Sequence, residues 1–163
     1  MDAELELPAF AAVENLRAAG LTVATAESCT GGMVAALLTG VPGASAVFRY
    51  GWVTYCNAAK QQELHVPAAT LEQYSAVSEP VVAAMAESAL SQAGADLAIA
   101  ISGNAGPTKG AENEPPVGTV CLALARKGLP TRTETLFLPG MHRAAFRRAV
   151  TAHALNRIAQ AAG

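Results

Sequence analysis

Residues 95–102 read ADLAIAIS, a short and almost continuous apolar run that lies between Gly94 and Gly103. A strand exposed on one face alternates apolar and polar residues, whereas this run is apolar at nearly every position, which is typical of a strand buried on both faces. Such a strand needs a covering layer on each side. The run therefore predicts a largely buried sheet within an α/β fold.

The segments on both sides of this run alternate between helical and extended patterns. Asn57 is the expected N-cap of a helix, and residues 45–56 are expected to form a strand pair or one long bent strand. We expect helices over residues 4–19, 33–40, 57–66, 79–93 and 142–162, and strands over residues 21–26, 45–56, 95–102, 117–126 and 131–138. The sequence thus predicts a single α/β domain over residues 1–163, a three-layer α/β/α arrangement with a mixed central sheet.

Composition and residue spacing give no reason to expect a nucleic-acid-binding, membrane, secreted or metal-binding protein. The chain has 163 residues, is 52% hydrophobic and 15% charged, and carries a net charge of −2, so it has no electrostatic reason to bind nucleic acid or an anionic membrane. No apolar run is long enough to span a bilayer, and the acidic N-terminus is unlike a signal peptide. Three cysteines without a CxxC partner favour a reduced, cytoplasmic setting. The three histidines lack ligand spacing, so no metal site is expected.

A strand-to-helix turn carries the first candidate chemistry. Residues 22–32 read TVATAESCTGG, and place Ser28 and Cys29 side by side ahead of Thr30, Gly31 and Gly32. Backbone N–H groups in such a turn can stabilise an oxyanion, which suits a nucleophile. The alternative is that Ser28 or Thr30 simply caps the next helix. Spacing alone modestly favours the cap.

A second candidate pair follows the aromatic strand. Tyr55 lies at the expected strand end, and Lys60 lies about one turn into the next helix, so both side chains can project toward one place. A lysine activates a serine only when burial or a neighbouring cation lowers its pKa. The alternative is a solvated helix lysine beside an amphipathic tyrosine, which is the usual state of an isolated lysine.

Two further segments can bind an anion. The first directly follows the buried strand and consists of Ser102, Gly103, Asn104, Ala105 and Gly106; its small residues allow close backbone approach, and it opens a long irregular segment over residues 102–118. The second is the pair Arg143 and Arg147, one helical turn apart, which can clamp a phosphate or a carboxylate. The plainer alternative for the first segment is a tight turn that leads into a flexible loop. For the arginine pair it is surface solvation or interhelical ion pairing.

Taken together, these segments resemble the C-terminal domain family of the competence/damage-inducible protein CinA. The resemblance covers roughly residues 9–160 and consists of several separate motifs in the family's order. The matching stretches are ATAESCTGG (24–32), VPGASAVFRYGWVTYCNAAK (41–60), AVSEPVVAAMAESAL (76–90), GADLAIAISGNAGP (94–107) and PPVGTVCLALA (115–125).

The resemblance implies an amidohydrolase that converts nicotinamide mononucleotide into nicotinic acid mononucleotide and ammonia, in pyridine-nucleotide salvage. It implies Ser28 as nucleophile, with Tyr55 and Lys60 at the family's other catalytic positions, and no metal or redox cofactor. The expected partners are the small nucleotide substrate and a second copy of the chain, with a dimer as the guess. A nucleotide-binding module with lost or altered amidase activity is the alternative, and a structural or interaction domain ranks last.

Two departures from the family pattern bear on substrate contacts. Ser102-Gly103-Asn104-Ala105-Gly106-Pro107 stands where the family usually has Thr-Gly-Ile-Ala-Gly-Pro, so Asn104 replaces an apolar side chain with an amide. Near the C-terminus the family's Gly-Asp-Arg corresponds to Gly140-Met141-His142-Arg143. We therefore expect the contacts to the substrate phosphate to depart from the family pattern more than the catalytic trio does.

Overall fold

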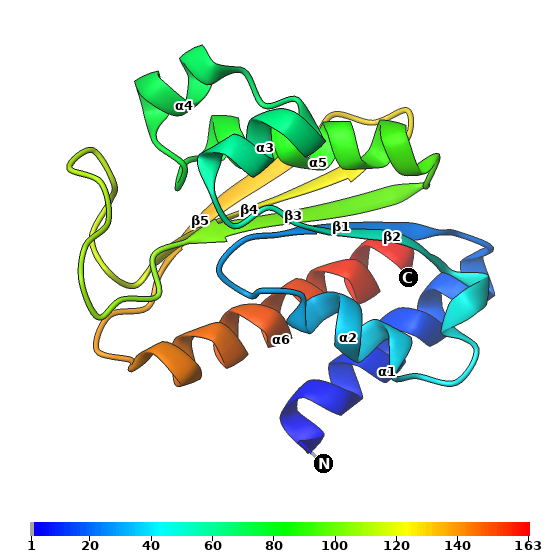
Figure 1. Ribbon diagram of the computed structural model, residues 1–163. Coiled ribbons are helices and arrows are strands. Elements are labelled where there is room, and N and C mark those ends of the chain that lie inside the picture. Colours follow the sequence, from blue (N-terminus) through cyan, green and yellow to red (C-terminus); the bar gives the residue numbers. More distant parts are fainter. Residues whose placement is uncertain (1) are drawn as a thin grey trace.

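The computed structural model describes residues 2–163, and its five strands form one mixed sheet in the order β2-β1-β3-β4-β5 (Figure 1). β1 pairs in parallel with β2 on one side and β3 on the other, while β4 runs antiparallel to β3 and to β5. The predicted mixed sheet and its antiparallel last pair are therefore confirmed. The strands are β1 (Val23–Glu27), β2 (Phe48–Val53), β3 (Leu97–Gly103), β4 (Thr119–Arg126) and β5 (Arg132–Phe137).

Helices cover both faces of this sheet (Figure 1). One face is covered by α1 (Ala3–Ala19), α2 (Met33–Thr39) and α6 (Arg143–Ala162). The other is covered by α3 (Asn57–Leu64), α4 (Ala68–Tyr74) and α5 (Glu79–Ala93). The three-layer α/β/α arrangement is thus the one that the sequence predicts. None of the helices within residues 2–163 combines the length and the apolarity that a membrane crossing requires.

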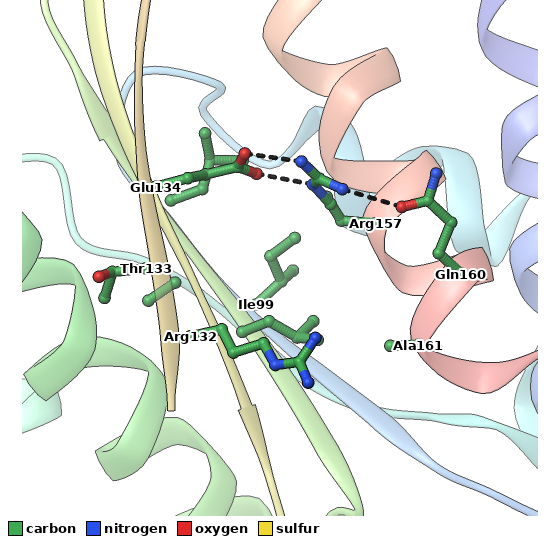
Figure 2. Close-up of a pocket in the computed structure, with 10 residues that line it drawn as sticks. Ile99, Arg132, Thr133, Glu134, Arg157, Gln160 and Ala161 are labelled. Atoms are coloured by element: carbon green, nitrogen blue, oxygen red, sulfur yellow. Dashed lines mark hydrogen bonds and ion pairs between the residues drawn. The ribbon is translucent and has the colours of Figure 1, made fainter. Parts of the chain in front are cut away.

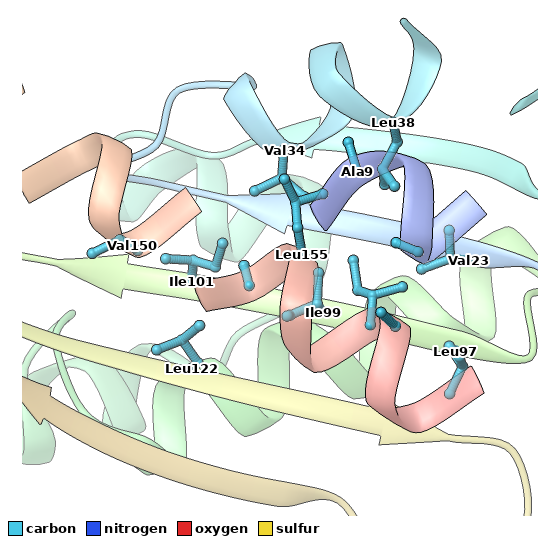
Figure 3. Packing of buried hydrophobic residues seen from close by; sticks show 14 of the residues in the cluster. Ala9, Val23, Val34, Leu38, Leu97, Ile99, Ile101, Leu122, Val150 and Leu155 are labelled. Atoms are coloured by element: carbon cyan, nitrogen blue, oxygen red, sulfur yellow. The ribbon is translucent and has the colours of Figure 1, made fainter. Parts of the chain in front are cut away.

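The side chains of β3 show why the central run is apolar throughout. Ile99 and Ile101 point toward α6 and α2, where they join the cluster that contains Val34 and Leu155 (Figure 3). The alternate positions are alanines such as Ala100, which pack on the α5 side. Large side chains fill one interface and small ones let α5 lie close on the other, so both faces of the strand are buried.

Two local predictions are wrong, and one short helix is not predicted by the sequence. Residues 45–56 form neither a strand pair nor one long bent strand: a short 3₁₀ turn, Ala44–Ala46, precedes the six-residue strand β2, and Gly51 pairs with Thr25 within the sheet. The N-cap of α3 is Cys56, and Asn57 is the first helical residue. α4 was not predicted, because it buries little besides Leu71 and so carries almost no apolar periodicity.

Candidate active site

A cavity of about 280 Å³ lies where the three parallel strands end. Ser28 directly follows β1, Tyr55 follows β2 after one intervening residue, and Ser102 is near the end of β3. The carboxyl ends of parallel strands are the usual place for a ligand in an α/β sheet. Eight residues singled out from the sequence line this cavity: Ser28, Tyr55, Lys60, Ser102, Gly103, Asn104, Ala105 and Arg143. Five others do not: Thr30, Gly31, Gly32, Gly106 and Arg147.

Ser28 and Lys60 meet inside this cavity. The Nζ atom of Lys60 lies 3.1 Å from the Oγ atom of Ser28 and donates a hydrogen bond of 2.8 Å to the carbonyl oxygen of Thr54. Lys60 is 1% exposed and Ser28 is 7% exposed. The amine is therefore aimed at a hydroxyl within proton-transfer distance, and solvent is nearly excluded from both.

The environment sets the protonation of the groups beside Ser28. Burial lowers the pKa of Lys60 from its ordinary value of 10.5, and the acidic groups Cys56, Cys29 and Glu114 oppose that shift. Burial also raises the pKa of Cys29 to about 12. Cys29 is then a neutral thiol near pH 7, which makes it a poor nucleophile, whereas a larger fraction of Lys60 is neutral and available to accept a proton.

The turn after β1 depends on its two glycines and on hydrogen bonds to Glu27. Gly31 and Gly32 have φ angles of +59° and +97°, a backbone region that a side chain disfavours. The N-cap of α2 is Gly32, and neither Ser28 nor Thr30 caps the helix, so the sequence-based cap is wrong. Instead, the buried carboxylate of Glu27 accepts hydrogen bonds from the backbone N–H groups of Val34 and Ala35.

Glu27 therefore frees the Ser28 hydroxyl for Lys60. In the sequence, Glu27 is only the polar end of a strand. Its spacing of seven residues from Val34 is too long for a standard capping box, so no local motif identifies it.

Arg143 and Arg147, the pair that the sequence suggests as an anion clamp, have different roles in the fold. Arg147 donates to the carbonyl oxygens of Cys29 at 2.9 Å and Thr30 at 3.3 Å, and so holds the turn from outside the cavity. Arg143 reaches into the cavity and donates to the carbonyl oxygen of Gly106 and to the Tyr55 hydroxyl, at 2.6 Å each. Tyr55 is 58% exposed. Its contact is thus with Arg143 at the mouth of the cavity, rather than with Ser28.

Two polar groups at this site are not indicated by the sequence. The carbonyl oxygen of Thr54 fixes the Lys60 amine, but a backbone acceptor leaves no trace in the residue types. Glu114 lines the cavity from the long irregular segment at residues 102–118. Within residues 2–163 the structure contains no cluster of three or more histidine, cysteine or acidic side chains that could hold a metal ion.

A second cleft, of about 320 Å³, lies between β5 and α6 (Figure 2). There the Arg157 guanidinium binds both carboxylate oxygens of Glu134 at 2.8 Å, and the imidazole Nε2 of His153 lies 2.7 Å from the same carboxylate. The hydrogen bond from Arg157 is the main cause that lowers the pKa of Glu134 to about 2. Both carboxylate oxygens are thus hydrogen-bonded, and among the described residues that line this cleft no nucleophile is paired with a base.

Comparison with known proteins agrees with the architecture. The chain is 37% identical to the competence-damaged protein (CinA) superfamily protein from Klebsiella pneumoniae, whose crystal structure it matches with a TM-score of 0.91 over 97% of each chain. It matches the competence/damage-inducible protein from Agrobacterium tumefaciens with the same TM-score at 36% identity, over 97% of this chain and 95% of that one.

The sequence relatives differ in length. A CinA-like protein of Akkermansia muciniphila is 54% identical over 145 residues, which are 89% of this chain and 34% of that protein. The nicotinamide-nucleotide amidohydrolase PncC of Escherichia coli is 50% identical over 147 residues, 90% of this chain and 88% of the relative. The family model for the CinA C-terminal domain matches residues 8–162. The chain belongs to the CinA C-terminal domain family.

Proposed function

We propose that the chain is an amidohydrolase that releases ammonia from the carboxamide of nicotinamide mononucleotide and leaves nicotinic acid mononucleotide. The observation that carries the proposal is the buried Lys60 amine, 3.1 Å from the Ser28 hydroxyl. A relative at 50% identity that bears the name nicotinamide-nucleotide amidohydrolase supports the choice of substrate.

The proposed reaction divides the hydrolysis into two steps. Neutral Lys60 takes the proton of Ser28 Oγ, which attacks the carboxamide carbon; the tetrahedral intermediate collapses, and ammonia leaves with the proton that Lys60 returns. Water, deprotonated by Lys60, then attacks the acyl-enzyme and releases the carboxylate and free Ser28. Burial supports this cycle because a lowered pKa increases the neutral fraction of the Lys60 amine at a given pH, and only the neutral amine can accept a proton.

Arg143 is proposed to hold the anionic end of the substrate. It is the arginine that lines the cavity, and its guanidinium is already oriented by Gly106 and Tyr55. Tyr55 would then position Arg143 and the substrate at the mouth. Arg147 acts on the turn and would affect catalysis only through the placement of Ser28.

The test is ammonia release from nicotinamide mononucleotide by the purified chain, with the Escherichia coli relative run in parallel and Ser28→Ala as the negative control. We expect turnover by the wild-type chain and none above background by the variant. Binding of the nucleotide without turnover of any pyridine carboxamide would support the alternative, a nucleotide-binding module. If the wild-type chain neither binds nor hydrolyses the nucleotide, both proposals are contradicted.

A further inference from the structure

The side chain of Asn104 is only half used by the fold. Its Oδ1 atom accepts a hydrogen bond of 3.2 Å from the backbone N–H of Gly106, which fixes the orientation of the amide. Its Nδ2 atom is buried and has no acceptor within residues 2–163. Asn104 is 8% exposed and lines the cavity that contains Ser28. A buried donor without an acceptor is rare and unfavourable in a folded chain, so it calls for an explanation.

The strand register places this amide on the same face of the sheet as the nucleophile. The Ser28 N–H donates to the carbonyl oxygen of Ile101 at 3.0 Å, which sets Ser28 beside Ser102. Asn104 continues the pairing of β3 with the neighbouring chain, because its N–H donates to the carbonyl oxygen of Thr119 at 2.9 Å. Side chains alternate along an extended chain, so Asn104 shares the face of Ser102, two residues or about 7 Å further along.

We propose that the Nδ2 group of Asn104 donates a hydrogen bond to the carbonyl oxygen of the carboxamide that Ser28 attacks. The inference rests on the proposed amidohydrolase function. The attacked carbon must lie about 3 Å from Ser28 Oγ, which places its oxygen within the cavity that Asn104 also lines. That oxygen is the acceptor of a carboxamide, and it gains negative charge in the tetrahedral intermediate. The bond therefore strengthens as the reaction proceeds.

A purely structural role leaves half of the amide unexplained. The hydrogen bond from Gly106 needs only an oxygen at this position, which an aspartate would supply equally well. Nothing in the described chain uses the N–H groups. A residue that recognises the substrate accounts for both halves, because Gly106 orients the oxygen and so points the donor at a fixed place.

Two variants separate these roles. Asn104→Asp keeps the oxygen that accepts from Gly106 and replaces the donor with an acceptor, while Asn104→Leu removes the polar group without adding charge. We expect both to lower kcat/KM for nicotinamide mononucleotide by about 100-fold, through a lower kcat together with weaker binding of the substrate. Asn113→Asp is the matched control: it makes the same charge change at an exposed position of the same segment, outside the cavity lining. It should leave kcat/KM unchanged, and thermal unfolding verifies that all three variants fold.

A binding measurement identifies the atom that Asn104 contacts. In a Ser28→Ala background, calorimetry compares nicotinamide mononucleotide with the pyridine mononucleotide that lacks the carboxamide. We expect Asn104→Leu to weaken binding of the first ligand and not of the second. The inference is overturned if Asn104→Leu weakens binding of both ligands equally, or if folded Asn104→Asp and Asn104→Leu keep the wild-type kcat/KM. In either case, activity of the wild-type chain would still support the proposed function. A wild-type chain that neither binds nor hydrolyses the nucleotide overturns both.

Discussion

The Ser28 cavity and the cleft between β5 and α6 handle charge in opposite ways. In the cleft between β5 and α6, Arg157 donates a hydrogen bond to each carboxylate oxygen of Glu134 (Figure 2). The imidazole of His153 contacts one of these oxygens as well. In the Ser28 cavity, the Lys60 amine is more deeply buried, yet it is held by a neutral hydroxyl and a backbone carbonyl instead of a carboxylate.

This difference separates groups that stabilise the fold from groups that can react. A paired carboxylate keeps its proton off down to acid pH, so the pKa of Glu134 falls to about 2 and it cannot serve as a base or an acid near neutrality. An unpaired buried amine has its pKa lowered instead, which brings its neutral form toward the working pH. A shifted pKa alone therefore does not identify a catalytic group. The direction of the shift, and whether the group has an oppositely charged partner, separate Lys60 from Glu134.

The largest expected effect is the loss of turnover on removal of either reacting group. Ser28→Ala and Lys60→Met should each lower kcat by roughly 10⁴-fold or more, because the nucleophile and its base act as one unit. For the same reason, the double variant should be no slower than either single variant. Ammonia release measures the rates. Independent, multiplying losses in the double variant would contradict a shared Ser28–Lys60 step.

The stability of the Lys60→Met variant tests whether Lys60, unlike Glu134 in the cleft, contributes nothing to the stability of the fold. An apolar side chain of similar length removes an amine that is costly to bury, so the variant should unfold at the same temperature or higher, although it is inactive. A large drop in the unfolding temperature would instead make Lys60 a structural residue.

The pH dependence should give the next largest effect. If neutral Lys60 is the base, kcat/KM rises about tenfold per pH unit until the pKa of Lys60, which lies below 10.5, and then levels off. Below that folded-state pKa, the folded chain must bury an ammonium that the unfolded chain hydrates. The destabilisation is therefore complete at low pH, and it is relieved as the pH rises toward the unfolded-state pKa.

Lys60→Arg provides the control for this titration. A guanidinium stays protonated throughout the range, so the variant should be inactive at every pH, with no rise in rate. Equilibrium unfolding of the wild-type chain and of Lys60→Met across the same range tests the stability half, since only the wild-type chain should gain stability in the interval between the two pKa values of Lys60.

The sequence predicts where the site lies in the fold better than it predicts the contacts between the residues of the site. The apolar run at 95–102 requires cover on both faces, and the candidate residues follow the ends of strands, so their gathering at one edge follows from the parallel order. The burial of Lys60 does not follow from its neighbours, because NAAKQQEL reads as a polar helix. It depends on Thr54 and on the turn after β1, which are brought close only by the fold. Glu27 is missed for the same reason, since its partners belong to α2.

The smallest expected effect comes from breaking the ion pair of the cleft. Because Glu134 has a lowered pKa, its contribution to stability is present above its unfolded-state pKa of about 4.5 and is lost as the pH falls toward about 2. Glu134→Gln should destabilise the chain by only about 1 kcal/mol at pH 7, since Arg157 is partly exposed. In a plot of the free energy of unfolding against pH, the variant should also lose less stability than the wild-type chain between pH 4.5 and pH 2.

The activity of this variant completes the comparison. Glu134→Gln should leave kcat/KM for nicotinamide mononucleotide unchanged, because the pair shares no contact with Ser28 or Lys60. Denaturant unfolding between pH 2 and 7, beside the ammonia assay, measures both quantities. A loss of turnover as large as that of Lys60→Met, with stability intact, would mean that the cleft takes part in the reaction and that full pairing of a carboxylate does not mark a purely structural group.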